Sequence, residues 1–189
     1  MNIVNVGYDS TNYYILSDGK PRLLVDAGWP GTLPKLQHQC KRMGIALADL
    51  KHFLITHYHP DHAGLAQELK RTGCKLILVD LQEAFVPTLR TWMKPEHPYV
   101  EIDLQDAVRI SLDDSRAFLA QLGIQGQIIH TPGHSDDSVT LVLDDGSAFT
   151  GDLPRPDMSE GIALESWQQL RALGVKRIHP GHGPVWSLT

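Results

Sequence analysis

The stretch THYHPDHAG, residues 56–64, places three histidines and an aspartate close together in one short segment. A packed core could not satisfy so many ring nitrogens and a carboxylate unless they bound something, because each buried polar group without a partner costs free energy. Imidazole nitrogens and carboxylate oxygens are common ligands of divalent cations. The stretch therefore predicts a metal-binding loop.

The spacing within this loop predicts where its side chains point. His57 and His59 are two positions apart, and alternate side chains of an extended chain lie on the same side, so both rings can reach one ion. Asp61 and His62 are adjacent and follow Pro60, where the chain must turn, so this pair can face a second ion nearby. The pattern differs from the helical zinc motif, in which two histidines share one helix face.

Three further candidates each follow a segment that the pattern predicts to be a strand. They are His134 in HTPGHSDDS, Asp152 in FTGDLP and His182 in HPGHGP. Loops held by a rigid sheet are where binding sites are usually assembled. Two ions about 3.5 to 4 Å apart require a carboxylate that can touch both, and Asp152, at a strand end with no evident structural duty, is the candidate.

The elements that must position these loops are short apolar runs and amphipathic stretches. Strand-like alternation begins at the amino terminus, and Asp18-Gly19 and Asp145-Gly146 predict tight turns between strands. Apolar runs predict further strands at residues 11–17, 21–28, 51–57, 75–80, 108–112, 127–133, 138–152 and 176–183. Helical spacing predicts helices at residues 32–44, 60–73, 81–93 and 114–123.

Two helix details carry specific expectations. Pro87 should kink or restart the third helix, because proline has no backbone N–H, and Asp113 or Asp114 should cap the fourth. The strands fall into two groups that are each mixed with helices, which predicts two packed sheets covered by helices. We expect residues 1–189 to form a single domain of this kind.

Composition limits the classes of function. The net charge is −5 and the lysines and arginines are scattered, so extended nucleic acid is not an expected partner, because phosphate binding depends on clustered cations. No apolar run approaches the roughly 20 residues that cross a bilayer, and the first residues lack a secretory signal, which predicts a cytoplasmic protein without a membrane partner. Cys40 and Cys74 lack metal-ligand spacing and are expected to be reduced packing residues.

Five segments together resemble one known family. They are LLVDAG, which contains Asp26, THYHPDHAG, TPGHSDDS, TGD and PGHGP, in that order along nearly the whole chain. The sequence is similar to the metallo-β-lactamase fold superfamily, whose signature is a His-x-His-x-Asp-His loop followed by a later His, Asp and His. The resemblance implies an α+β fold, a four-layer αββα sandwich of two mixed β-sheets flanked by helices, which agrees with the layering predicted above.

The resemblance also implies a ligand set for two divalent metal ions, with zinc expected and iron or manganese as alternatives. The implied ligands are His57, His59 and His134 for the first ion, Asp61, His62 and His182 for the second, and Asp152 between them. Asp26 would lie behind the ligands and orient one of them. Asp61 would in addition be catalytic, orienting the attacking hydroxide and relaying its proton.

Other polar residues have no motif support. We expect ordinary surface or packing roles for His38, His52, His97, His130 and His179, and turn or capping roles for Asp136 and Asp137. Residues 81–112, which include Phe85, Trp92, Met93 and Tyr99, either form a wall over the metals or pack inward as outer helices. The loop at residues 154–161 is another candidate wall, and Leu65 stands where many relatives have glycine.

The resemblance implies a hydrolase that acts on a small-molecule ester, thioester or lactone. Aspartate at position 152 disfavours a true β-lactamase, in which cysteine or no bridging ligand usually stands there. The alternatives are a mononuclear-iron persulfide dioxygenase, a β-lactamase or phosphodiesterase on the same fold, and a catalytically silent metal-binding protein. The oligomeric state does not follow from the sequence.

Overall fold

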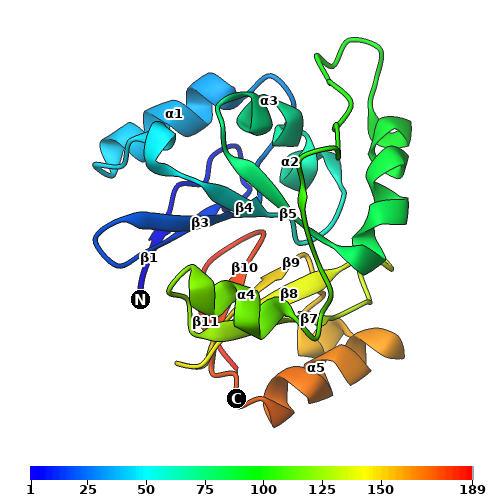
Figure 1. Cartoon of the computed structure of the whole chain (residues 1–189). Helices are drawn as coiled ribbons and strands as arrows, with labels where there is room; N and C mark the ends of the chain where they lie inside the picture. Colours follow the sequence, from blue (N-terminus) through cyan, green and yellow to red (C-terminus); the bar gives the residue numbers. More distant parts are fainter. Residues whose placement is uncertain (189) are drawn as a thin grey trace.

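The computed structural model describes residues 1–188, including all their side chains except those of residues 21 and 22. Two mixed β-sheets lie face to face, and helices cover their outer surfaces (Figure 1). This is the α+β arrangement of two mixed sheets flanked by helices that the sequence predicted.

The first sheet is built from the amino-terminal part of the chain, and its strands lie in sequence order. They are β1 (Asn2–Asn5), β2 (Tyr14–Ser17), β3 (Pro21–Val25), β4 (His52–Leu54), β5 (Lys75–Val79) and β6 (Val108–Ile110). The strands β1 to β3 pair antiparallel, and β3 to β6 pair parallel. Parallel neighbours need a crossover, and α1 (Leu33–Arg42) and α3 (Ala66–Arg71) supply it above this sheet in Figure 1.

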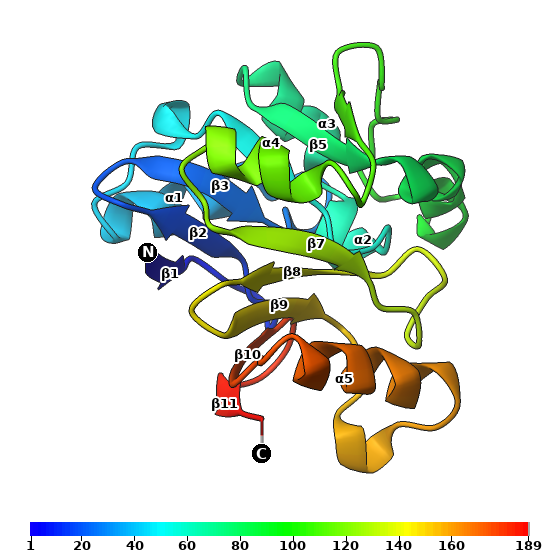
Figure 2. The same cartoon turned by 60° about the horizontal axis from the view of Figure 1, so that its bottom comes forward.

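The second sheet has the strand order β11-β10-β9-β8-β7. Its strands are β7 (Gly126–His130), β8 (Val139–Leu143), β9 (Ser147–Gly151), β10 (Arg177–Pro180) and β11 (Trp186–Ser187). The parallel pair β9 and β10 is connected by α5 (Ile162–Ala172), which lies along the outer face of this sheet in Figure 2. The helix α4 (Ser115–Gln121) packs beside β7.

Alternation along the central strands divides the core into layers. In β5, Leu76 and Leu78 pack toward the helices of the first sheet, whereas Ile77 and Val79 pack toward the second sheet. In β8, Val142 belongs to the separate apolar cluster beneath α5. Both faces of these strands are buried, which explains why they are continuous apolar runs in the sequence.

The range 60–73, predicted as one helix, is divided into α2 (Pro60–Ala63) and α3. The break has a tertiary cause, because the amide of Leu65 donates to the carbonyl of Gly28 at 2.8 Å instead of continuing the helical ladder. The prediction of a continuous helix was therefore wrong. The division leaves α2 as a single short turn that directs the metal-loop residues.

Other predicted elements differ in detail. The helix predicted at residues 81–93 is the 3₁₀-helix η2 (Asp80–Trp92), which runs through Pro87 without restarting there. Asp114 stands at the amino-terminal cap position of α4, but its side chain makes no capping bond and accepts from the Ser111 hydroxyl at 2.7 Å. The helix α5 and the strand β11 were not predicted. The signal for α5 was the spacing of Ala163 and Trp167, which are both buried on one helix face.

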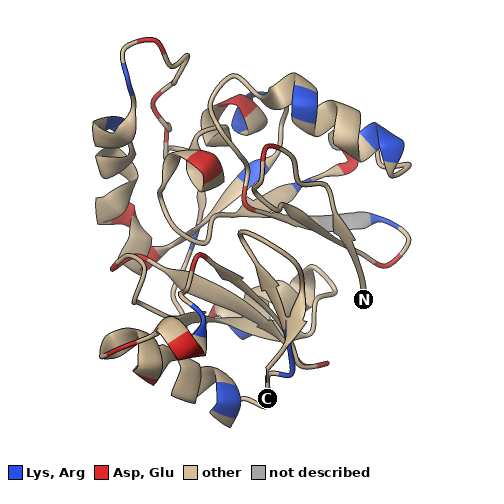
Figure 3. Ribbon diagram, turned by 180° about the vertical axis from the view of Figure 1, so that it is seen from behind, with Lys and Arg blue, Asp and Glu red and all other residues tan. Residues whose placement is uncertain are grey.

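Charge and cysteine placement follow the sequence expectations. Figure 3 shows Lys and Arg on many separate elements, interspersed with Asp and Glu. Within the described chain, Cys40 and Cys74 are both buried and not in a disulfide. Burial raises the pKa of the Cys40 thiol to about 11 and that of Cys74 to about 12. Over residues 1–188, no helix has the length and apolar character needed to cross a membrane.

Candidate metal centre

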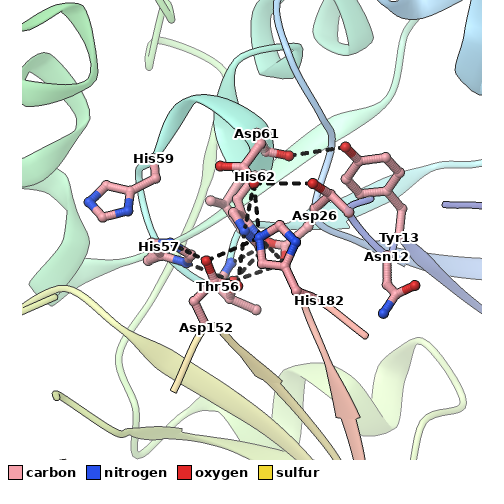
Figure 4. Close-up of polar contacts among 12 residues, drawn as sticks. Asn12, Tyr13, Asp26, Thr56, His57, His59, Asp61, His62, Asp152 and His182 are labelled. Atoms are coloured by element: carbon pink, nitrogen blue, oxygen red, sulfur yellow. Dashed lines mark hydrogen bonds and ion pairs between the residues drawn. The ribbon is translucent and has the colours of Figure 1, made fainter. Parts of the chain in front are cut away.

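The candidate ligands lie on loops that directly follow strands of both sheets. Asp26 follows β3, His57 follows β4, His134 follows β7, Asp152 follows β9 and His182 follows β10. The strands β3 and β4 are parallel, as are β9 and β10, so each pair delivers its loops to the same edge. Figure 4 shows candidate residues of the two sheets pointing toward one another.

The first cluster consists of His57, His59 and His134, which present ligand atoms within 4.8 Å of one another. His59 Nδ1 lies 2.9 Å from His134 Nε2, although the two residues come from different loops. The ring of His57 is centred 4.6 Å from that of His59, as expected for alternate residues on one side of an extended segment. Tyr58, between them, points the other way and is buried in the core.

The second cluster consists of Asp61, His62, Asp152 and His182, again with ligand atoms within 4.8 Å of one another. His182 Nε2 lies 3.1 Å from Asp61 Oδ2 and 3.3 Å from Asp152 Oδ2. His62 Nε2 lies 3.2 Å from Asp152 Oδ1 and 3.5 Å from Asp61 Oδ2. The two clusters are adjacent, since the rings of His57 and His62 are centred 4.3 Å apart.

Asp152 lies between the two clusters. Its Oδ2 atom is 3.7 Å from His134 Nε2 and 3.9 Å from His57 Nε2, in addition to its contacts with His62 and His182. One carboxylate therefore faces histidines of both groups, which is the position that a bridging ligand would need.

The residues fit divalent cations. Three atoms that face the centre, His57 Nε2, His62 Nε2 and Asp152 Oδ1, are buried and make no hydrogen bond within the described chain, although the last two lie 3.2 Å apart as an ion pair. Buried polar atoms rarely stay without a partner, since each costs free energy. Imidazole nitrogens with carboxylate oxygens form a donor set that suits zinc and related ions.

Hydrogen bonds to the Nδ1 atoms of two histidines fix the orientation of their rings. His62 Nδ1 lies 2.9 Å from Asp26 Oδ2, and His182 Nδ1 lies 2.9 Å from the carbonyl of Ser10. Since an acceptor faces each Nδ1, the proton of the neutral ring belongs there, and the Nε2 lone pair is then directed at the centre. Asp26 also accepts from the Thr56 amide at 2.7 Å, and its φ of 64° is a strained conformation that persists because the surroundings determine it.

The loop between β1 and β2 supports the second cluster, and the sequence did not identify it. Ser10 has a φ of 70°, Thr11 forms a backbone bridge with His182, and Thr11 Oγ1 donates to Asp61 Oδ2 at 3.1 Å. Asn12 donates to two backbone carbonyls next to His182. The available signal was a run of turn-forming residues, GYDSTN, between two strand patterns.

Burial and neighbouring charges shift the pKa values of the clustered residues. Burial alone would lower the pKa of His62, but Asp26 and Asp152 outweigh it and raise that pKa to about 10. Hydrogen bonds, above all with Asp152, raise the pKa of His182 to about 11, and they hold the pKa of Asp152 far below its usual range against the effect of burial. Burial lowers the pKa of His57. Cation binding must therefore displace protons from the second cluster.

A cavity of about 430 Å³ opens beside His134, Asp152 and His182. Its outer wall contains Arg155 and Trp186, and the Arg155 guanidinium lies 4.4 Å from the centre of the Trp186 ring. Part of the predicted wall loop, residues 154–161, therefore lines this cavity. A larger cavity of about 580 Å³ lies between α4, β7 and α5 and is lined by none of the candidate ligands.

Each of the two alternatives for residues 81–112, a wall over the metals or inward packing, applies to part of the segment. The Trp92 ring lies 4.8 Å from that of His59 and is 56% exposed, so it borders the first cluster. Tyr99 is buried in the core, and Met93 packs against the same core cluster. These two residues therefore follow the inward-packing alternative.

The other histidines, and Asp136 and Asp137, lie outside both clusters of the described chain. Ring contacts join His52 to Phe118 and His97 to Trp29, and His130 is hydrogen-bonded to the carbonyl of Asp136. The exposed His38 and the buried His179 also lie outside, and so do the carboxylates of Asp136 and Asp137.

Comparison with known proteins gives independent information on the family of the chain. The family model described as "Metallo-beta-lactamase superfamily" matches residues 6–182. A "Beta-lactamase-like protein 2 homolog" of Drosophila melanogaster is 30% identical over 184 residues, which are 93% of this chain and 59% of that protein. An "Atrochrysone carboxyl ACP thioesterase" of Aspergillus fumigatus is 28% identical over 186 residues, covering 93% of this chain and 51% of that one.

The fold also matches a solved structure. The crystal structure of a metallo-beta-lactamase family protein from Thermus thermophilus has a TM-score of 0.74 at 21% identity, covering 98% of this chain and 74% of that one. At such low identity the likeness concerns the fold alone. The chain spans about half the length of the curated relatives that it matches.

Proposed function

The chain belongs to the metallo-beta-lactamase superfamily, and we propose that it is a metal-dependent hydrolase of a small ester, thioester or lactone with a two-cation centre. The ligands in this proposal are His57, His59 and His134 for one cation, Asp61, His62 and His182 for the other, and Asp152 for both. Zinc is the expected metal.

The observation that carries this proposal is the position of Asp152. Its two oxygens lie 3.2 Å and 3.3 Å from His62 Nε2 and His182 Nε2, and one of them is within 4 Å of His134 and His57. Within the described chain, every ion pair of this carboxylate is with a candidate histidine ligand. This arrangement suits a centre in which a single side chain binds two ions.

Cations held by these residues would supply Lewis acidity, which makes hydroxide available near neutral pH and polarises a substrate carbonyl. We assign to Asp61 the role of accepting a proton from the attacking water. Burial would raise its pKa, but the hydrogen bond with His182 and the charge of His62 lower it, so Asp61 remains a carboxylate. Thr11 holds Asp61 Oδ2 from behind, which directs the carboxylate as an acceptor for the proton of the attacking water.

The walls of the centre support a substrate with two different ends. The exposed Trp92 ring beside His59 offers an apolar surface, which suits an acyl chain. The 430 Å³ cavity on the other side ends at Arg155 and Trp186, which suit an anionic or planar polar group. Curated relatives of the chain include acyl-carrier-protein thioesterases, which supports thioesters as the first class to test.

The test combines metal analysis with a substrate panel. We expect about two zinc ions per chain after reconstitution, and turnover of small acyl thioesters, esters or lactones by the loaded protein. Asp152→Ala should reduce both bound metal and turnover, whereas Asp144→Ala, an exposed carboxylate paired with Arg116 outside the centre, should change neither. Full zinc occupancy without turnover of any panel member would refute the hydrolase assignment.

The same panel addresses the other activities considered from the sequence. Hydrolysis of a β-lactam or a phosphodiester in preference to thioesters, esters and lactones would change the substrate class. One iron per chain, with oxygen consumption in the presence of a persulfide, would replace the hydrolase assignment by a dioxygenase. None of these three activities is favoured by a contact that the described residues make in the centre.

A further inference from the structure

We propose that two buried residues outside the ligand set, Asp137 and Gln82, are positioning residues that clamp the loop of His57 and His59 to the loop of His134. The first cluster is assembled from these two loops, one from each sheet. Its geometry therefore depends on how the loops are fixed to each other. The inference rests on the proposed function in one respect, namely that this cluster binds a cation.

Asp137 forms the first half of the clamp. Its carboxylate is only 3% exposed, and Oδ2 accepts a hydrogen bond of 2.7 Å from the backbone amide of Tyr58. Tyr58 stands directly between His57 and His59, and Asp137 lies three residues after His134. One short bond thus connects the middle of one ligand segment to the end of the other.

Gln82 forms the second half. It lies on η2, is fully buried, and its Nε2 is 3.2 Å from the Thr56 carbonyl and 3.0 Å from the Asp137 carbonyl. It is also 3.2 Å from the carbonyl of Ile55, so three acceptors share its two N–H groups. The side chain therefore bonds to the backbone of both loops.

Backbone contacts alone provide little of this connection. The amide of Val139 donates to the Thr56 carbonyl at 2.8 Å, and this bond joins the residue before His57 to the start of β8, five residues after His134. Beyond it, the ring nitrogens of His59 and His134 approach to 2.9 Å, so small loop movements would separate them. Ligand sites tolerate displacements of only about 0.5 Å, so bonds behind the loops should determine the affinity.

The test measures cation binding and uses matched variants. Asp137→Ala removes the acceptor, Asp137→Asn keeps one, and Gln82→Met keeps the side-chain length without N–H groups. Protein is dialysed against buffered free zinc, bound zinc is counted, and cobalt(II) absorption reports the ligand geometry. We expect Asp137→Ala and Gln82→Met to weaken one of the two sites by about 10- to 100-fold and to alter its cobalt spectrum, with near wild-type behaviour in Asp137→Asn.

Ser115→Ala is the control for general destabilisation. Ser115 is a buried side chain that likewise joins two elements, since it accepts from the Ile128 amide at 3.0 Å and donates to the Leu112 carbonyl at 2.6 Å, but it contacts no candidate ligand. This variant should lower the Tm without changing zinc affinity. Equal weakening of both sites in step with Tm, or equal loss in Asp137→Asn and Asp137→Ala, would overturn the positioning role.

A measurement on metal-free protein separates this inference from the proposed function. The exchange rate of the Tyr58 amide should rise by about 10-fold or more in Asp137→Ala and stay unchanged in Ser115→Ala, because one hydrogen bond is lost. Unchanged exchange in Asp137→Ala would refute the clamp. Wild-type protein that took up no zinc would instead refute the proposed function. If one clamp variant fails to fold, the other decides the result.

Discussion

His179 leads to a prediction that links stability to pH. This side chain is 6% exposed, and its ring stacks on Phe149 with centroids 4.9 Å apart and meets the Tyr14 ring edge-on at 5.3 Å. Neither ring nitrogen has a hydrogen-bond partner in the described chain. Burial therefore disfavours the charged imidazolium and lowers the pKa of His179 to about 4.

The sign and size of the effect follow from proton linkage. Between pH 6.5 and about 4 the unfolded chain binds a proton at His179 that the folded chain does not, so the free energy of unfolding falls as the pH falls. With these two pKa values the loss is about 2 kcal/mol at pH 5 and only about 0.2 kcal/mol at pH 7. Replacing His179 by phenylalanine retains an aromatic ring and removes the proton site.

The assay compares urea unfolding of metal-free wild type and His179→Phe at pH 7 and pH 5. The difference between the two proteins should shift by about 2 kcal/mol in favour of the variant at the lower pH, whatever its sign at pH 7. Taking the difference removes the titration of the metal-site histidines, which both proteins share. His38→Gln, at an exposed position of α1, should show no such shift. A difference independent of pH within about 0.5 kcal/mol would refute the desolvation argument.

Three further predictions concern the centre. Asp26→Ala removes the partner of His62 Nδ1 and of the Thr56 amide, so zinc affinity measured by chelator competition should fall about 10- to 100-fold, and unchanged affinity would contradict its orienting role. Trp92→Ala should leave bound zinc unchanged and raise KM for long acyl substrates more than for acetyl substrates, since the exposed ring borders His59 without supplying a ligand atom; equal changes for both would exclude an acyl wall. Chelation should lower the unfolding free energy by about 2.7 kcal/mol for each bound ion relative to protein with free zinc at one hundred times Kd, and a Tm independent of zinc would contradict a folded-state site.

Local patterns were sufficient for much of the fold. Residues 76–79 are apolar throughout because this part of β5 is buried on both faces, and residues 32–44 have the spacing of α1. Errors arose where tertiary contacts override local preference. Leu65 ends a helix that its sequence would continue, because its amide bonds to the Gly28 carbonyl, which is distant along the chain.

In the candidate site, too, local features were predictable and tertiary contacts were not. The His57–His59 spacing predicted a shared side because the period of an extended chain is a local property. The contacts made by Ser10, Thr11 and Asn12 with the second cluster were not predictable, since they join the first loop of the chain to its last candidate ligand. Asp137 was assigned a turn role, and its buried bond to the Tyr58 amide is visible only in the structure.

The sequence by itself determined which side chains could bind cations and which face of each strand is buried, because residue type and the periods of helix and strand act over a few positions. Tertiary structure alone decided that Asp152 faces both clusters and which groups hold each ring from behind. Those relations join residues from 18 positions apart, for His134 and Asp152, to 172, for Ser10 and His182, and their distances depend on how the two sheets pack rather than on any local preference.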